Sequence, residues 1–283
     1  MAVKSNTALL EVLAKNNLDK STQEWLREKT LKIVGEKSVK DIYLTYSLLA
    51  RKATNEKITV LDSSDLENYL KLQDATVLEM SRIFLLTEIL NADRDFFSSK
   101  VKKIISVADS KELETFLKYL ILLPKPEDYK SVAVDALRTN IASVFDALAL
   151  HNPFPAEYFD DAQWNQMYLK AAFMQRPLNK IPKVDERANE DLARIISDYA
   201  HERWAAGRDI DPYFWRPVSP FMNETLLDDM NHLFKSEDPV RQKAAALCCA
   251  NSTSAEAKKM LETFPELYKL IKNNQLSWNT LYD

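Results

Sequence analysis

Apolar residues recur at intervals of three and four positions along most of the chain. Between residues 131 and 150, for example, one face of a helical wheel carries Val134, Leu137, Ile141, Val144 and Leu148. This spacing is typical of amphipathic α-helices that bury one side. The same pattern predicts helices at residues 5–17, 21–34, 38–53, 63–72, 75–92, 94–107, 110–123, 131–150, 161–175, 188–206, 220–235, 237–251, 254–264 and 266–274.

Several predicted helices begin at a capping motif, in which a side chain and the backbone satisfy each other's hydrogen-bonding groups. At three of them a polar residue precedes a carboxylate by three positions: Ser21 and Glu24, Ser38 and Asp41, Asp109 and Glu112. Most connections between helices are short. We expect longer irregular segments at residues 54–62, 124–130, 151–160, 176–187 and 207–219.

Short connections place successive helices antiparallel to one another. The segment DPVRQKAAAL, from Asp238 to Leu247, is similar to the second helix of a HEAT repeat, where Asp and Pro start the helix and alanines allow close stacking. No period of about 40 residues recurs elsewhere. The sequence therefore predicts an all-α fold, an α–α superhelix of HEAT/armadillo-like helix pairs. A compact irregular helical domain is the alternative.

The amino-acid composition excludes several classes of binding function. The chain has two glycines, Gly35 and Gly207, which excludes the glycine-rich loops that bind nucleotide phosphates. A net charge of −4 offers no basic surface for nucleic acid. Because no apolar run approaches the ~20 residues of a membrane span and the N-terminus lacks a secretion-signal pattern, we expect a cytoplasmic protein. The adjacent Cys248 and Cys249 are expected to be buried thiols.

The stretch LALHNPFPAEYFDDAQW, starting at Leu148, gathers polar residues at a corner between two predicted helices. His151 ends one helix and Glu157, Asp160 and Asp161 precede the next, so each charge suits the dipole of its helix end. The alternative is a ligand-facing site, in which His151 and Glu157 are catalytic candidates. Asn165, on the following helix, would need hydrogen-bond partners if buried, and the HNPFP turn could supply them.

A second polar constellation lies on the helix predicted at 188–206. Asp191, Arg194, Asp198 and His201 follow one another at intervals of three and four residues. They can form a solvated charge ladder. Alternatively, Asp198 and His201 have the spacing of a carboxylate-oriented general base, which makes them catalytic candidates. No third metal ligand is identifiable, and we predict no metal and no cofactor.

Arg203, on the same helix, falls on the apolar face of the helical wheel. If it is buried, its guanidinium needs a carboxylate, and the candidates are Glu157, Asp160 and Asp161. The set of candidate binding residues is Arg138, Asn140, Asn165, Arg194, Arg203 and Trp204.

The motifs LALHNPFPAEYF, WNQM and DYAHERW, within residues 136–221, resemble the EboA family. The resemblance divides the chain into an N-terminal helical region, 1–130, and a signature region, 131–283, within what we expect to be one continuous elongated domain. It also implies a setting. Genes of this family typically lie beside those of a UbiA-like prenyltransferase, a TIM-barrel protein and a TatD-like hydrolase, in a cluster associated with moving a natural-product precursor. It assigns no catalytic residue.

Two hypotheses follow. The first is a non-enzymatic accessory protein of such a biosynthesis and export cluster, which binds one of these proteins or a small-molecule intermediate. The second is an enzyme of the same pathway that uses an Asp/His acid–base pair.

Overall fold

The computed structural model describes residues 3–59 and 65–283, and for residues 3–6 it describes the helical backbone alone. Regular structure in these ranges is helical, apart from one isolated antiparallel bridge between Lys57 and Thr76. The predicted all-α class is therefore confirmed. The predicted start of a helix at residue 63 lies outside the described residues. The chain divides into two compact units, Met1–Phe154 and Pro155–Asp283.

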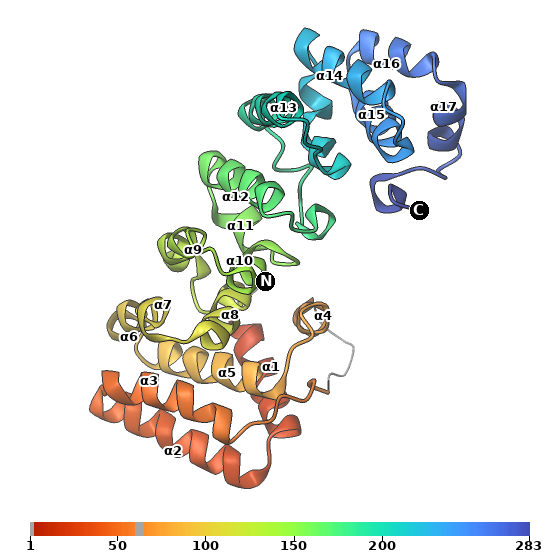
Figure 1. Ribbon diagram of the computed structural model, residues 1–283. Coiled ribbons are helices and arrows are strands. Elements are labelled where there is room, and N and C mark those ends of the chain that lie inside the picture. The colour runs from red at the N-terminus through yellow and green to blue at the C-terminus, as the bar shows by residue number, and fades with distance from the viewer. Residues whose placement is uncertain (1–2, 60–64) are drawn as a thin grey trace. The chain divides into compact units, whose positions relative to one another are not determined.

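The first unit holds the helices coloured from red to green in Figure 1. With η denoting a 3-10 helix, they are α1 (Val3–Asn17), α2 (Lys20–Glu36), α3 (Val39–Leu48), η1 (Leu49–Arg51), α4 (Asp65–Leu72), α5 (Val77–Ala92), α6 (Arg94–Val101), α7 (Ile104–Val107), α8 (Ser110–Lys118), η2 (Leu120–Leu122), η3 (Pro126–Tyr129), α9 (Lys130–Ala136) and α10 (Ala142–Ala149).

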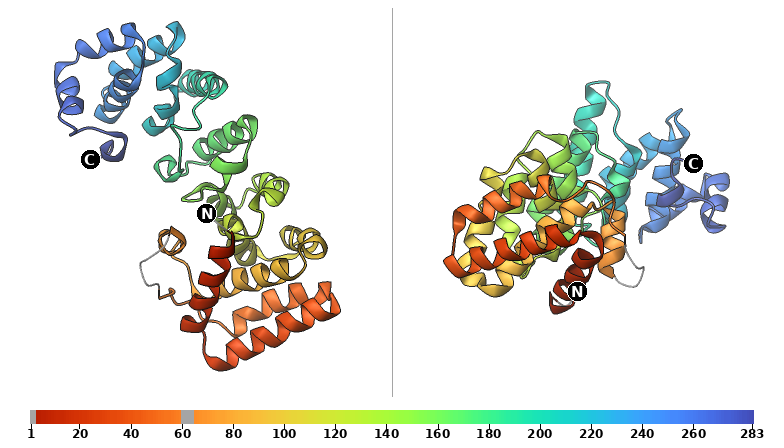
Figure 2. Two further views of the ribbon diagram at one scale, coloured as in Figure 1. Left: turned by 180° about the vertical axis from the view of Figure 1, so that it is seen from behind. Right: turned by 90° about the horizontal axis from the view of Figure 1, so that it is seen from below.

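Helix α5 is the centre of this unit. It packs against α1, α2, α6 and α8, and it is buried on nearly every side, including at Met80, Leu86 and Ile89. A helix that is apolar all round belongs in a core. Helices α2 and α3 form an antiparallel hairpin beside it, as Figures 1 and 2 show.

Two of the three predicted capping motifs are confirmed. Ser38 caps α3 by accepting from the backbone N–H of Asp41, and Asp109 and Glu112 form a capping box at the start of α8. The motif predicted at Ser21 is wrong, because α2 begins at Lys20 and the side chain of Asp19 caps it by accepting from the N–H of Thr22.

The helix predicted at 131–150 is interrupted between α9 and α10. Thr139 Oγ1 accepts a hydrogen bond from the backbone N–H of Ile141 at 3.1 Å, and this local bond competes with helical pairing. Ile141 takes an extended conformation and is 53% exposed, so it does not join the predicted apolar face. The helix predicted at 94–107 is likewise divided, into α6 and α7.

The second unit follows α11 (Phe154–Tyr158), which spans the boundary. It contains α12 (Asp161–Phe173), η4 (Leu178–Lys180), α13 (Glu190–Ala205), η5 (Pro212–Phe221), α14 (Glu224–Phe234), α15 (Pro239–Asn251), α16 (Ala255–Glu262), α17 (Pro265–Lys272) and η6 (Trp278–Thr280). Figure 2 shows these helices from two further sides.

Helix α15, which begins in the HEAT-like segment, is the core helix of the second unit. It packs against α14, α16, α17 and η5, and residues 244–249 are buried. Its run of alanines leaves room for close approach by these neighbours. Cys248 and Cys249 are free and buried, as predicted, and burial raises the pKa of the Cys249 thiol to about 12. In residues 3–59 and 65–283, no helix has the length and apolar character needed to cross a membrane.

Candidate functional site

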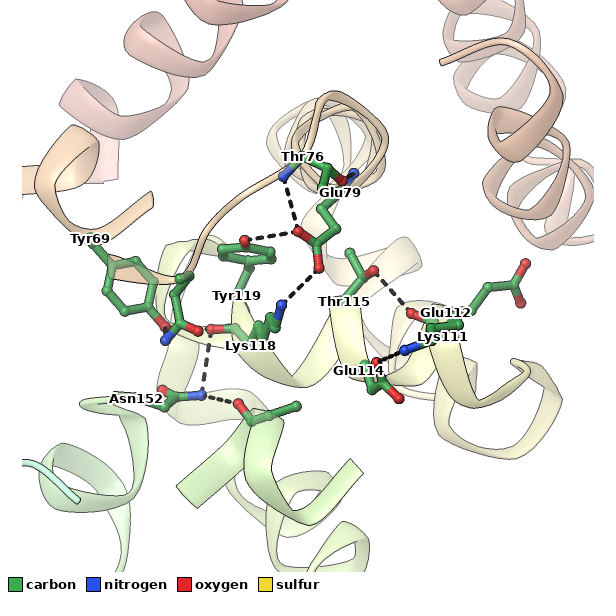
Figure 3. A network of polar contacts seen from close by, with 12 residues as sticks. Tyr69, Thr76, Glu79, Lys111, Glu112, Glu114, Thr115, Lys118, Tyr119 and Asn152 are labelled. Atoms are coloured by element: carbon green, nitrogen blue, oxygen red, sulfur yellow. Dashed lines mark hydrogen bonds and ion pairs between the residues drawn. The ribbon is translucent and has the colours of Figure 1, made fainter. Parts of the chain in front are cut away.

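The HNPFP corner is organised by Asn152, which lies in the first unit and is 1% exposed. Its side-chain Nδ2 donates to the carbonyl oxygens of Ala147 at 2.9 Å and Leu117 at 3.0 Å, and reaches that of Lys118 at 3.4 Å. Its Oδ1 accepts from the backbone N–H of Phe154 at 3.0 Å. Asn152 thus joins the end of α8 to the end of α10 (Figure 3).

His151, the neighbouring catalytic candidate, closes α10 in a left-handed conformation, with φ of 55°. Its backbone carbonyl accepts from Gln73 Nε2 at 2.9 Å, and the same amide nitrogen reaches Tyr69 Oη at 3.4 Å. The Tyr69 hydroxyl donates to the carbonyl of Lys118 at 2.5 Å. The corner is therefore bonded to the segment after α4 as well as to α8.

Glu79 is the carboxylate of this polar network, shown at the centre of Figure 3. It forms a capping box with Thr76, pairs with Lys118 Nζ at 3.0 Å, and accepts from the Tyr119 hydroxyl at 3.3 Å. Burial raises the pKa of Tyr69 and Tyr119 above the usual tyrosine range. Both phenols therefore remain protonated and act as hydrogen-bond donors.

The corner carboxylates of the second unit are each bound locally. Glu157 pairs with Lys183. Asp160 caps α12 through a capping box with Gln163. Asp161 accepts from Arg187 at 3.0 Å. The charges at these helix starts thus follow the predicted dipole arrangement.

Arg187 is the cation that holds this end of the second unit together. Besides Asp161, its guanidinium donates to the carbonyl of Ala156 at 2.8 Å and lies 5.2 Å from the centre of the buried Trp164 ring. Such a cation–π contact adds to the stability of a partly buried guanidinium.

Asn165 is buried, as its position on the helical wheel suggested, and its partner is Asn189 and not the HNPFP turn. The two amides bond reciprocally, at 2.9 and 3.0 Å. Asn189 also caps α13 by accepting from the N–H of Leu192 at 2.9 Å. The pair therefore fixes the start of α13 against α12.

Asp191, Arg194 and Asp198 on α13 form the predicted ladder of ion pairs, and it is exposed to solvent. Arg194 pairs with Asp198 at 2.9 Å and with Asp191 at 3.8 Å, and all three side chains are more than 60% exposed. The ladder lines a groove of about 560 Å³ together with Ser197. Pairs this exposed contribute little to stability.

His201 departs from the ladder. Its Nε2 lies 2.6 Å from Oδ1 of Asp229 on α14, instead of bonding to Asp198, whose carboxylate is paired with Arg194. Asp229 is 2% exposed and its Oδ2 also accepts from Ser197 Oγ at 2.6 Å. Because the carboxylate is the central member, the serine hydroxyl bonds to Asp229 and not to an imidazole that could activate it as a nucleophile.

Trp204 lies among aromatic neighbours in the same region. Its ring centre is 4.1 Å from that of His232, 5.7 Å from that of His201, and 5.7 Å from that of the buried Trp215. The side chain is thus part of the packing between α13, η5 and α14.

Arg203 does not bind the predicted carboxylates. Its Nε and Nη2 donate to the backbone carbonyl of Asp209, at 3.2 and 2.9 Å. Arg203 lines a groove with Phe173 at the end of α12, whereas Asp160 and Asp161 lie at the start of that helix. The chain after α13 turns back at Gly207, which brings the carbonyl of Asp209 to the guanidinium.

The two candidates between α9 and α10 are on the surface. Arg138 pairs with Asp135, three residues earlier, and its side chain is 83% exposed. Asn140 is exposed in the interruption before α10. Among the described residues, no group of three His, Cys, Asp or Glu side chains could hold a metal ion.

The structure adds Asn152, Arg187 and Asp229 to the residues that sequence patterns had selected. Asn152 was within the quoted corner motif, and the constraint of Pro153 on the residue before it was a signal that its backbone is fixed. Asp229 lies in a segment, DDMNHLFK, whose spacing gave no indication of a contact with His201.

Residues 6–219 match the model of the family described as metabolite traffic protein EboA, which is about three quarters of the chain. No curated protein and no solved structure matches this chain. The match includes the helices before residue 130, where sequence motifs gave little, and it ends before Asp229 and His232. The chain belongs to the EboA family of metabolite traffic proteins.

Proposed function

We propose that this chain is a cytoplasmic helical-repeat accessory protein of a natural-product biosynthesis and export cluster, and that it binds a partner protein or a small-molecule intermediate. The partners we propose are the UbiA-like prenyltransferase, the TatD-like hydrolase and the TIM-barrel protein of such a cluster. HEAT/armadillo-like pairing of the helices is part of the proposal, because such arrays present extended surfaces to partners.

The observation that supports this role most is how the polar residues of the signature segments are used. Asn152 bonds to α8 and α10, Asn165 bonds to Asn189 across α12 and α13, and Arg187 bonds to the backbone of α11. Each of these contacts joins a helix to another part of the chain. Because these polar residues hold the fold together, their use favours a scaffold protein that binds its partners through its surface.

Affinity purification of the tagged full-length chain from native membranes tests the proposal, with mass spectrometry for both proteins and small molecules. We expect recovery of a cluster protein or of a bound metabolite in excess over an unrelated helical protein. Recovery of neither would contradict the accessory role.

An enzymatic role in the same pathway is the second candidate, and the bond between His201 and Asp229 favours it. The imidazole is half exposed, and a buried carboxylate at 2.6 Å orients its Nε2, so Nδ1 could serve as a base. Replacing both His201 and His151 with alanine should then abolish pathway output while the protein stays folded. The third histidine supplies a control in His232→Ala. Full output from the double variant would exclude this version.

A further inference from the structure

A groove of about 590 Å³ lies in the first unit, between α1, α2 and α5. This volume is within the range of small-molecule sites. Buried apolar side chains lie at its base: Ala14, Leu18 and Leu26, each 7% exposed or less. Leu31, 64% exposed, and Phe84 add apolar surface at the side.

Glu88 on α5 gives this groove a specific polar group. Its carboxylate lines the groove, is half-buried, and has no hydrogen bond or ion pair among the residues that the structure describes. Burial, and secondarily the charge of Glu11 on α1, raise the pKa of Glu88. A half-buried carboxylate without a partner is stabilised when a cation or a hydrogen-bond donor binds to it.

The other charged side chains that line the groove do not supply a cation to the Glu88 carboxylate among the described residues. Glu11 pairs with Lys15 at 2.8 Å, and that pair is more than half exposed. Glu24 and Arg27, both exposed on α2, complete the ionisable groups. With three carboxylates and two cations, the groove is net negative, and its least hydrated charge is Glu88.

The groove between α1, α2 and α5 lies wholly within the part of the chain that the family match covers. All of its lining residues, from Glu11 to Glu88, fall inside residues 6–219. Three further grooves each include residues beyond 219: Arg241, Leu226 and Trp278 are examples. A site for a role shared by the family should be built from residues that the family match covers.

We propose that the groove between α1, α2 and α5 binds an amphipathic organic cation, with an ammonium group against the carboxylate of Glu88 and an apolar body on Leu18, Leu26 and Phe84. The inference rests on the proposed metabolite-binding role and gives that role a site and a class of ligand.

Isothermal titration of the full-length protein with naphthylmethylamine, and with naphthoate as an anion of similar body, tests the proposal. The amine should bind, and naphthoate should bind at least tenfold more weakly. Glu88→Gln, which keeps the shape and removes the charge, should weaken amine binding about tenfold. Glu28→Gln is the matched control, because Glu28 is on α2, is 74% exposed and does not line the groove.

A second variant guards against an indirect effect of Glu88→Gln on folding. Leu31→Lys adds a cation beside the groove at an exposed position and should also weaken amine binding, with an unchanged circular dichroism spectrum. No amine binding, equal binding of both probes, or equal amine affinity in the wild type, Glu88→Gln and Glu28→Gln would each overturn the proposal.

Failure of the site can be distinguished from failure of the proposed function. If the wild type and Glu88→Gln recover the same partners and metabolites from native membranes, the accessory role stands and the groove is not its site. If the wild type recovers nothing, the accessory role fails, whatever the amine titration shows.

Discussion

Asn152 stabilises the HNPFP corner through buried hydrogen bonds. Its amide supplies donors to the carbonyls of Leu117 and Ala147 at a site closed to water. Asn152→Ala leaves both carbonyls unsatisfied and should lower the free energy of unfolding by about 2–4 kcal/mol. Urea unfolding measures this. The exposed Asn140→Ala is the control and should change stability by less than about 0.5 kcal/mol. Equal effects would refute this account of the corner.

Glu88 should also make stability depend on pH. Because its pKa is raised in the folded protein, the native state binds more protons than the unfolded chain between the two pKa values. The charged Glu88 carboxylate therefore lowers the free energy of unfolding at a pH above its pKa in the folded protein. This loss of stability disappears as the pH falls below the pKa of Glu88 in the unfolded chain. Glu88→Gln should melt higher than the wild type at pH 8 and equally at pH 4, in calorimetry. The gain should stay below about 1 kcal/mol, because solvent screens a half-buried carboxylate. A variant that melts lower at pH 8 would contradict it.

Sequence patterns identified the polar residues of the candidate site better than their partners. Asp198 and His201 were within reach along one helix, but His201 bonds to Asp229, 28 residues later on α14. Periodicity reports which side of a helix is polar, and contains no information on which helix will face it. The candidate roles of these residues in binding or catalysis stay predictions.

At the scale of helices, the apolar pattern predicted where helices occur better than it predicted where they are interrupted. The apolar period continues through Ile141, but a threonine hydroxyl two residues earlier bonds to the backbone there and helix α9 has already ended. Left-handed residues other than glycine follow two of the helices. Lys37 caps the end of α2, and His151 lies two residues after the end of α10, both with positive φ. A left-handed residue other than glycine costs about 1–2 kcal/mol, which the packing of these helices offsets.

The two glycines allow a matched test of helix energetics. Gly35 is inside α2, and a Cβ there would meet no atom within 4 Å, so Gly35→Ala should stabilise the protein by about 0.5–1 kcal/mol. Gly207 follows α13 with φ of 65°, so the same change should destabilise by a similar amount or more. Chemical denaturation measures both. The interpretation fails if the two substitutions shift stability in the same direction.

At the scale of the whole molecule, the division into two compact units determines how far a local loss of stability is expected to spread along the chain. Stability need not be uniform along a chain, because contiguous parts of a protein can open as separate cooperative units. The sequence predicts one continuous domain, with regions divided near residue 130, and this stays a prediction. Contacts within the structure cluster into two compact units, divided between Phe154 and Pro155. Asn152 belongs to one, and Asp229, which holds Ser197 and His201, belongs to the other.

We expect the two units to respond separately. In hydrogen exchange measured by mass spectrometry, Asn152→Ala should speed exchange in α8 and α10 and leave α13 and α14 protected. Asp229→Ala should do the reverse, since it removes a buried carboxylate that bonds to α13. If either variant lowers protection evenly in both units, the chain unfolds as one cooperative domain. Local responses would instead allow partner or metabolite binding in one unit to be altered by mutation without unfolding the other.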